Sequence, residues 1–167
     1  MAERDIIALA RTVGEQLRAR GLTIATAESC TGGAVAAALA AIPGASDYLH
    51  GGIVAYHAEV KARLLGVSAT LLARDGVVSA ACALAMAHGA RAACGADIGV
   101  ATTGIAGPGG AEPSKPVGLV HLAISWPGGE RTSQKIYHGD RMTVISAAVF
   151  DALELVISSQ AAIGSRQ

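Results

Sequence analysis

One short stretch of this chain combines residue types that nucleophilic catalysis needs. Residues 28–33 read Glu-Ser-Cys-Thr-Gly-Gly and lie between an apolar run, residues 22–27, and an Ala-rich run, residues 34–42. This pattern is typical of a strand, a tight turn and the start of a helix. The first N–H groups of a helix lack intrahelical partners, so a hydroxyl or a bound anion at this turn would meet hydrogen-bond donors. Ser29 is therefore the first candidate nucleophile.

Two other interpretations of this stretch remain open. Ser29 or Thr31 could simply cap the helix, and the glycine pair that follows could simply allow the helix to pack closely on a sheet. Cys30 could itself be a nucleophile, because a thiol at the start of a helix can have a lowered pKa. A small residue packed behind the turn is the commoner role for such a cysteine.

A serine hydroxyl becomes a good nucleophile only when a base removes its proton, and lysine or histidine can be that base. Lys61 is the stronger candidate, because it follows the end of a predicted strand where few other charges lie. Its pKa, ordinarily about 10.4, would have to fall toward about 7 to 8. A lone lysine in a helix is more often a solvated surface residue. Two of the five histidines fall inside predicted elements, and the three that lie near element ends stay alternatives: His50, His57 and His138.

The elements that must position these residues can be read from hydrophobic periodicity and from capping residues. Helical spacing over residues 6–17 ends at Gly21, and residues 158–167 resemble a frayed tail. Apolar, β-branched runs predict strands at 22–27, 51–56 and 98–101, and a hairpin of 117–126 with 131–138. Further helices are predicted at 31–42, 58–65, 68–74, 79–93 and around 144–155.

Strands that alternate with helices and end in a hairpin predict an α/β fold. We expect a three-layer α/β/α sandwich with a mixed, mostly parallel sheet of about five strands that includes the C-terminal hairpin. In such sheets, ligands bind outside the carboxyl ends of the strands. Three segments rich in hydroxyl, amine or glycine follow predicted strands and should converge there: residues 28–33, 56–61 and 102–110.

Composition limits the function classes. The 167 residues are 51% apolar and 16% charged, which predicts one domain over residues 1–167 with its core at about 5–160. Thirteen basic and thirteen acidic residues with 3% aromatics argue against a nucleic-acid partner. We expect a cytoplasmic protein without membrane contact, because a signal-peptide pattern and an uninterrupted apolar span are lacking. The cysteines, Cys30, Cys82 and Cys94, lack the spacing of a disulfide framework or a structural zinc site.

Several motifs, in order, resemble those of the CinA C-terminal domain family. They are residues 27–33, Tyr56 and Lys61 ahead of residues 65–67, residues 103–110 with 115–118, and residues 139–141. The resemblance covers about residues 5–160, and ordered motifs are far more specific than a single hexapeptide. It implies a stand-alone amidase domain, without the larger N-terminal domain of full-length CinA proteins. The implied reaction converts nicotinamide mononucleotide into nicotinate mononucleotide and ammonia.

The resemblance also implies roles for individual residues. Ser29 matches the nucleophile, Lys61 the general base, and Thr103 with the Gly-rich loop after it the wall of the amide site. The implied substrate-binding residues are Thr31, Gly32, Gly33, Tyr56, Gly104, Gly107 and Arg141. Amide hydrolysis also needs N–H donors for the oxyanion, from Cys30 and Thr31 or from residues 104–107.

No metal and no cofactor is implied, the expected partner is a small nucleotide substrate, and we expect a homo-oligomer, a dimer or higher. The chain has His57-Ala58 where the family commonly has Ser-Asn. Two alternatives therefore stay open: a non-catalytic nucleotide-binding module of the same fold, and a Ser/Lys amidase for another small amide.

Overall fold

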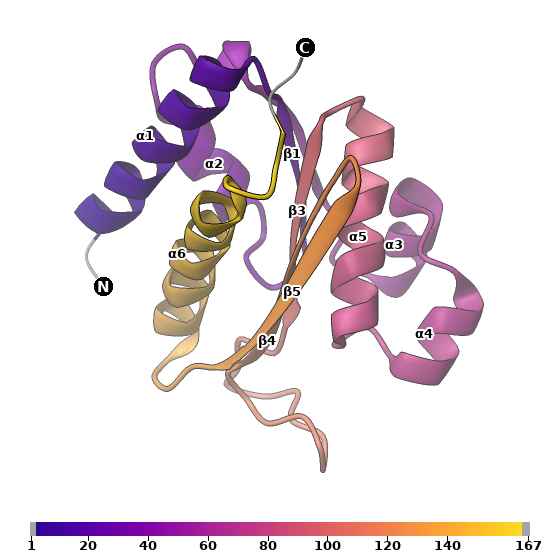
Figure 1. The fold of residues 1–167 in the computed structure, drawn as a ribbon. Helices are drawn as coiled ribbons and strands as arrows, with labels where there is room; N and C mark the ends of the chain where they lie inside the picture. Colours follow the sequence, from indigo (N-terminus) through magenta and orange to yellow (C-terminus); the bar gives the residue numbers. More distant parts are fainter. Residues whose placement is uncertain (1–2, 165–167) are drawn as a thin grey trace.

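The computed structural model describes residues 3–164, with side chains from residue 6 onward, and shows helices on both faces of one sheet (Figure 1). The strands are β1 (Ile24–Glu28), β2 (Leu49–Val54), β3 (Ile98–Gly104), β4 (Leu119–Trp126) and β5 (Gly129–Ile136). The helices are α1 (Glu3–Arg20), α2 (Ala34–Ala40), α3 (Ala58–Leu65), α4 (Ala69–Asp75), α5 (Ala80–Cys94) and α6 (Arg141–Ser159), and Ala45–Asp47 forms a 3-10 turn.

The five strands follow the order β2-β1-β3-β4-β5. β1 pairs in parallel with β2 and with β3, whereas β3 with β4 and β4 with β5 are antiparallel pairs. Only β4 therefore runs opposite to the others. α1, α2 and α6 cover one face of the sheet, and α3, α4 and α5 cover the other (Figure 1). The predicted three-layer sandwich with a mixed, mostly parallel sheet is confirmed.

The two faces of the sheet carry different side chains, because successive residues of a strand point to opposite faces. Large residues such as Ile24, Val100 and Leu122 belong to the core shared with α1, α2 and α6. The opposite face is lined by alanines, which belong to the core shared with α5: Ala25, Ala27, Ala101 and Ala123. Small side chains on this face bring α5 close to the sheet, and α3 packs against α5.

Several element boundaries differ from those expected. α2 begins at Ala34 instead of residue 31, and β2 ends at Val54, so Tyr56 lies beyond the strand. The prediction of a frayed tail over residues 158–167 is wrong for the residues of this segment that the structure describes. α6 continues to Ser159, and Ile163 is buried in the core, where its carbonyl accepts a hydrogen bond from Arg20 at 2.8 Å. Residues 165–167 lie outside the described residues.

α6 is the one helix in the described part of the chain that is long and apolar enough to cross a membrane. Its length and composition alone are weak evidence of a membrane span, because 50% of its most apolar stretch is buried inside the fold. Val144, Ala148 and Val156 of this helix belong to the hydrophobic core. A buried core helix can have the same length and apolar composition.

Candidate functional site

The three predicted segments meet at one cavity, outside the carboxyl ends of β1, β2 and β3. The cavity measures about 240 Å³. Side chains and backbone from the β1–α2 turn, the β2–α3 connection, the α4–α5 connection, the loop after β3 and the start of α6 form its wall. Its lining residues are Ser29, Cys30, Tyr56, Lys61, Val77, Val78, Thr103, Gly104, Ile105, Ala106, Gly107, Gly109, Gly110 and Arg141.

Ser29 and Lys61 are in direct contact in this cavity. Lys61 Nζ lies 3.0 Å from Ser29 Oγ, within hydrogen-bonding distance. Ser29 immediately follows β1. Lys61 lies in α3, on the face of the sheet that α5 also covers. The two side chains are 8% and 1% exposed, respectively. The pair is therefore shielded from bulk water but reaches the cavity wall.

Lys61 lies in surroundings that favour its neutral form. Burial lowers its pKa, because a buried ammonium loses its hydration. The Nζ atom also contacts the carbonyl oxygens of Ala55, at 2.6 Å, and of Tyr56, at 3.3 Å. A neutral amine has two N–H groups, which match these two carbonyls, and one lone pair, which is left for the Ser29 hydroxyl proton. This arrangement suits a general base.

Cys30 lines the same cavity but has the properties of a buried thiol. Burial raises its pKa to about 11, so the thiol stays protonated near neutral pH. A protonated thiol is a poor nucleophile. Of the two candidate nucleophiles, Ser29 therefore has the base and Cys30 does not have the ionisation that it would need.

Glu28 is a residue of this site that the sequence analysis did not single out. Its carboxylate is 1% exposed and accepts five hydrogen bonds. Oε2 accepts from Thr31 Oγ1 at 2.6 Å, from the Gly33 N–H at 3.0 Å and from the Val35 N–H at 3.0 Å. Oε1 accepts from the Ala36 N–H at 2.8 Å and from Thr26 Oγ1 at 3.1 Å. One signal was available, because Glu28 is the only charged residue between Arg20 and Asp47.

The N-terminal donors of α2 are therefore occupied by a side chain of the protein itself. The expectation that they would be open to a hydroxyl or a bound anion is not met. Thr31, Gly32 and Gly33 are also absent from the cavity wall, although substrate binding was expected of them. The hydroxyl of Thr31 contacts Glu28 and, at 2.7 Å, Thr102 Oγ1. These residues shape the turn beneath Ser29.

The loop after β3 forms the opposite wall. Gly104 and Gly107 line the cavity as expected, and so does Thr103, whose hydroxyl donates to the Val77 carbonyl at 2.7 Å. Val77 and Val78 are wall residues that the sequence did not indicate, because they lie in the α4–α5 connection and carry no polar group. The N–H of Ile105 donates to the Leu119 carbonyl at 2.9 Å, which removes it from the expected oxyanion donors.

Arg141 and Tyr56 lie together at the mouth of the cavity. Arg141 Nη2 donates to the Tyr56 hydroxyl at 2.7 Å, and Nη1 donates to the Gly107 carbonyl at 2.8 Å. Tyr56 is 57% exposed. One guanidinium thus joins the loop after β3, the β2–α3 connection and the start of α6. This cation lies at the rim, where it can meet the charged part of a ligand whose neutral part enters the cavity.

None of the alternative histidines reaches the cavity wall. His57 is exposed and precedes α3, and its side chain makes no capping hydrogen bond there. His50 Nδ1 contacts the Cys94 carbonyl at 3.3 Å, and His138 is exposed. Within residues 3–164, no three His, Cys, Asp or Glu side chains form a group that could hold a metal ion.

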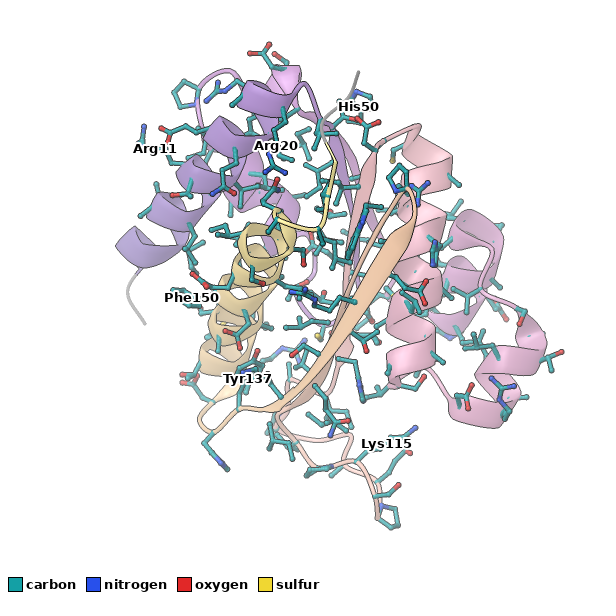
Figure 2. The ribbon with its side chains drawn as sticks, viewed as in Figure 1. Arg11, Arg20, His50, Lys115, Tyr137 and Phe150 are labelled. Atoms are coloured by element: carbon teal, nitrogen blue, oxygen red, sulfur yellow. The ribbon has the colours of Figure 1, made fainter. Side chains whose placement is uncertain are left out.

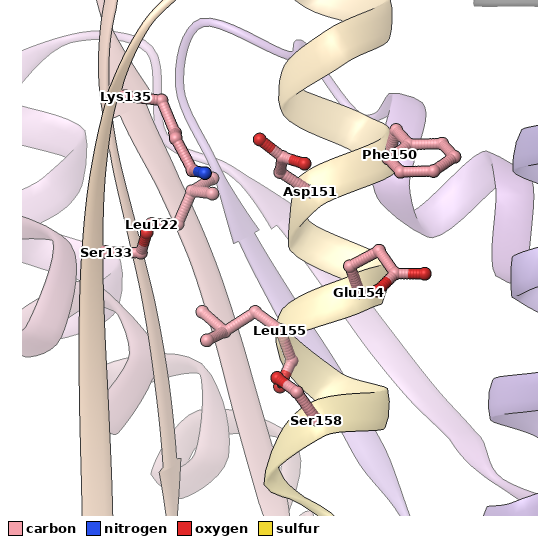
Figure 3. Close-up of a pocket in the computed structure, with 8 residues that line it drawn as sticks. All are labelled: Leu122, Ser133, Lys135, Phe150, Asp151, Glu154, Leu155 and Ser158. Atoms are coloured by element: carbon pink, nitrogen blue, oxygen red, sulfur yellow. The ribbon is translucent and has the colours of Figure 1, made fainter.

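A second cavity, of about 300 Å³, lies between β5 and α6 (Figure 3). Lys135 and Asp151 face each other across it, and Leu122 and Leu155 contribute apolar surface (Figure 3). The Asp151 carboxylate accepts a hydrogen bond from the Tyr137 hydroxyl at 2.6 Å. None of the expected catalytic or binding residues lines this cavity.

Comparisons with known proteins agree with this fold. The family model described as the CinA C-terminal domain matches residues 6–159. A CinA-like protein of Synechococcus sp. (strain RCC307) is 52% identical over 155 residues, which are 91% of this chain and 37% of that protein. A CinA-like protein of Anaeromyxobacter dehalogenans (strain 2CP-1) is 53% identical over 141 residues, 84% of this chain and 35% of that protein. The chain thus spans about a third of the length of these relatives.

Solved structures are similar over nearly their whole length. The competence/damage inducible protein CihA from Agrobacterium tumefaciens has a TM-score of 0.90 and 44% identity, with 92% of this chain and 94% of that chain covered. A CinA superfamily protein from Klebsiella pneumoniae 700603 has a TM-score of 0.91 and 37% identity, with 94% of this chain and 98% of that chain covered. By sequence and by structure, the chain belongs to the CinA C-terminal domain family.

Proposed function

We propose that this domain is an amidohydrolase that converts nicotinamide mononucleotide into nicotinate mononucleotide and ammonia. The observation that carries the proposal is the contact of 3.0 Å between Lys61 Nζ and Ser29 Oγ, with the amine buried and its pKa lowered. A neutral lysine beside a serine hydroxyl is a known way to activate that nucleophile.

In the proposed reaction, Lys61 takes the Ser29 proton while Oγ attacks the carboxamide carbon. Backbone N–H groups at the cavity wall stabilise the negative charge on the carbonyl oxygen. The resulting Lys61 ammonium gives its proton to the amide nitrogen, the C–N bond breaks, and ammonia leaves an ester on Ser29. Lys61 then removes a proton from water, whose oxygen attacks the ester carbon. The C–Oγ bond breaks, Lys61 returns the proton to Ser29 Oγ, and the carboxylate product leaves.

The shape and charge of the cavity support a nucleotide amide as substrate. Val77, Val78 and Ile105 offer apolar surface for a heteroaromatic ring. Arg141 is positioned at the mouth, where its remaining hydrogen-bonding capacity suits a phosphate group. The ring and the phosphate would then lie at opposite ends of the bound molecule.

Ammonia release from nicotinamide mononucleotide is the direct test. We expect turnover by the wild-type protein and none by Ser29→Ala, because the variant lacks the attacking oxygen. Ser158→Ala, which changes a serine near the far end of α6, is the matched control and should keep the wild-type rate. Turnover by folded Ser29→Ala would remove Ser29 as the nucleophile. A panel of other amides, with and without a phosphate group, tests the substrate. If the wild-type protein hydrolyses only these other amides, the Ser-Lys mechanism stands and the proposed substrate is wrong.

A further inference from the structure

We propose that Glu28 is a positioning residue for the nucleophile, which acts by fixing the turn that carries Ser29. The inference rests on the proposed function for its catalytic readout, but its argument is geometric. Glu28 and Ser29 are neighbours at the carboxyl end of β1, so their side chains point to opposite faces of the sheet. Ser29 meets Lys61 on the α3 side, while Glu28 meets the start of α2.

The five hydrogen bonds of Glu28 span the residues on both sides of Ser29. Thr26 lies within β1, whereas Gly33, Val35 and Ala36 lie at the beginning of α2. One buried carboxylate therefore joins the end of β1 to the first turn of α2. Negative charge at a helix N-terminus is favourable, and hydrogen bonds to a charged acceptor are stronger than neutral ones. The backbone between these anchors, which includes Ser29, has little freedom to move.

A second chain of contacts connects this carboxylate to β3. The Thr31 hydroxyl lies 2.6 Å from Glu28 Oε2 and 2.7 Å from Thr102 Oγ1. The N–H of Ser29 donates to the carbonyl of the same Thr102, at 3.0 Å. The next residue of β3, Thr103, lines the cavity. Glu28 thus sets the nucleophile relative to the opposite wall without touching the cavity itself.

Two variants isolate this role from a contribution to stability. Glu28→Gln keeps the size of the side chain but replaces an acceptor oxygen by an NH₂ group, which cannot accept from the backbone N–H groups. Asp97→Asn is the matched control, because Asp97 Oδ2 accepts from the N–H and the hydroxyl of Thr23, both at 2.9 Å, at the opposite end of the same strand. Both variants change a carboxylate into an amide beside β1.

The measured quantity is the rate at which a small fluorophosphonate modifies Ser29, followed by mass spectrometry of the intact protein. In this reaction Ser29 Oγ bonds to phosphorus, fluoride leaves, and the serine proton passes to Lys61. We expect Glu28→Gln to slow labelling and kcat by at least about tenfold at an equal folded fraction, because misplacing a reacting atom by about 1 Å can cost on the order of a hundredfold. KM should change by less than about twofold, because no substrate contact is removed. Asp97→Asn should keep the wild-type labelling rate.

Thr31→Val and Thr31→Ser test the same proposal if Glu28→Gln does not fold. Valine removes the hydroxyl that joins Glu28 to Thr102 and should slow labelling, whereas serine keeps the hydroxyl and should restore it. Wild-type labelling in folded Glu28→Gln, or an equal loss in Asp97→Asn, would overturn the positioning role. Labelling of wild-type Ser29 without ammonia release from nicotinamide mononucleotide would refute only the proposed substrate. An unlabelled wild-type Ser29 would overturn both the nucleophile and the role of Glu28.

Discussion

Lys61 is buried, and among the described residues no carboxylate contacts its Nζ atom. In the proposed reaction, the rate therefore depends on whether Lys61 is protonated. Because a base must be neutral to accept a proton, kcat/KM should rise as pH increases through the lowered pKa of Lys61 and then level off. Lys61→Arg should be inactive at every pH, since a guanidinium stays protonated. A pH profile of ammonia release measures both. An active Arg variant would show that this position supplies only positive charge.

The same lysine links folding to pH. In the unfolded chain its pKa returns to the ordinary value of 10.5, above the value in the fold. Between the two values the unfolded chain holds a proton that the folded protein lacks, so the free energy of unfolding should increase as pH rises through this range. Urea denaturation at several pH values should show this rise for the wild type. Lys61→Met, which cannot titrate, should show a flatter curve, and an identical curve would contradict a buried neutral lysine.

Cys30 provides the complementary prediction for the nucleophile. Its thiol has a pKa of about 11 because it is buried, so little thiolate is present near neutral pH. Cys30→Ala should therefore keep most of the amidase activity, and fluorophosphonate should still modify Ser29. If Cys30→Ala is inactive while folded and Ser29→Ala is active, the nucleophile lies one residue further along the chain.

At this scale the sequence predicted the contact between Ser29 and Lys61 through the rule that parallel strand ends converge. It could not predict Glu28, because the five partners of that carboxylate become neighbours only when the turn folds back over it. The resemblance implied substrate binding by Thr31, and the turn directs its hydroxyl to Glu28 and Thr102. Residue type indicated the chemistry, but the direction of each side chain depends on the turn.

α6 contributes to the site through its first residue. Asp140 caps this helix by accepting from the Thr143 N–H at 2.8 Å, and Arg141 then projects to Gly107 and Tyr56. We expect Arg141→Ala to lower kcat/KM for nicotinamide mononucleotide by at least about tenfold, since a charge-assisted hydrogen bond contributes about 1.5–3 kcal/mol. For the corresponding riboside, which lacks the phosphate, kcat/KM should fall much less.

Arg131→Ala is the control for this prediction, because Arg131 lies on the edge strand β5 and contacts the Ser158 carbonyl at 3.3 Å, away from the cavity. This variant should leave kcat/KM unchanged for both substrates. Equal losses on both substrates in Arg141→Ala would assign Arg141 to the reacting amide or to folding. The sequence predicted this helix around residues 144–155, whereas α6 begins at Arg141, directly after its capping residue Asp140. The contact between Arg141 and Tyr56 joins residues 85 positions apart and could not be predicted.

The whole molecule depends on a close approach between α5 and the sheet. A Cβ atom on Gly99 would lie 1.9 Å from the Ala87 carbonyl oxygen, so no side chain fits there without moving the helix. Gly99→Ala should lower the free energy of unfolding by about 1–3 kcal/mol, as overpacking does in other cores. Gly109→Ala, where a Cβ would meet no atom within 4 Å, should leave stability unchanged. Denaturant titration of both variants measures the difference.

The three layers were predictable from the alternation of strands and helices. The distance between the layers could not be predicted from the sequence. It depends on which face of each strand carries alanine and glycine once the strands have paired. A glycine inside a strand generally weakens it, whereas Gly99 allows α5 to pack closely on the sheet.

The loop between β3 and β4 extends beyond the end of the sheet (Figure 1), and Lys115 lies on it (Figure 2). It supplies one wall of the cavity beside Ser29 through residues 105–110, and Lys115 joins its outer part to the end of α4 by a hydrogen bond to the Asp75 carbonyl at 3.3 Å. Insertions or substitutions at residues 109–114 can therefore reshape the cavity while the hydrophobic layers stay as they are. Ligand preference can thus change without loss of the core, because the loop that lines the cavity and the residues that fill the hydrophobic layers lie in separate parts of the chain.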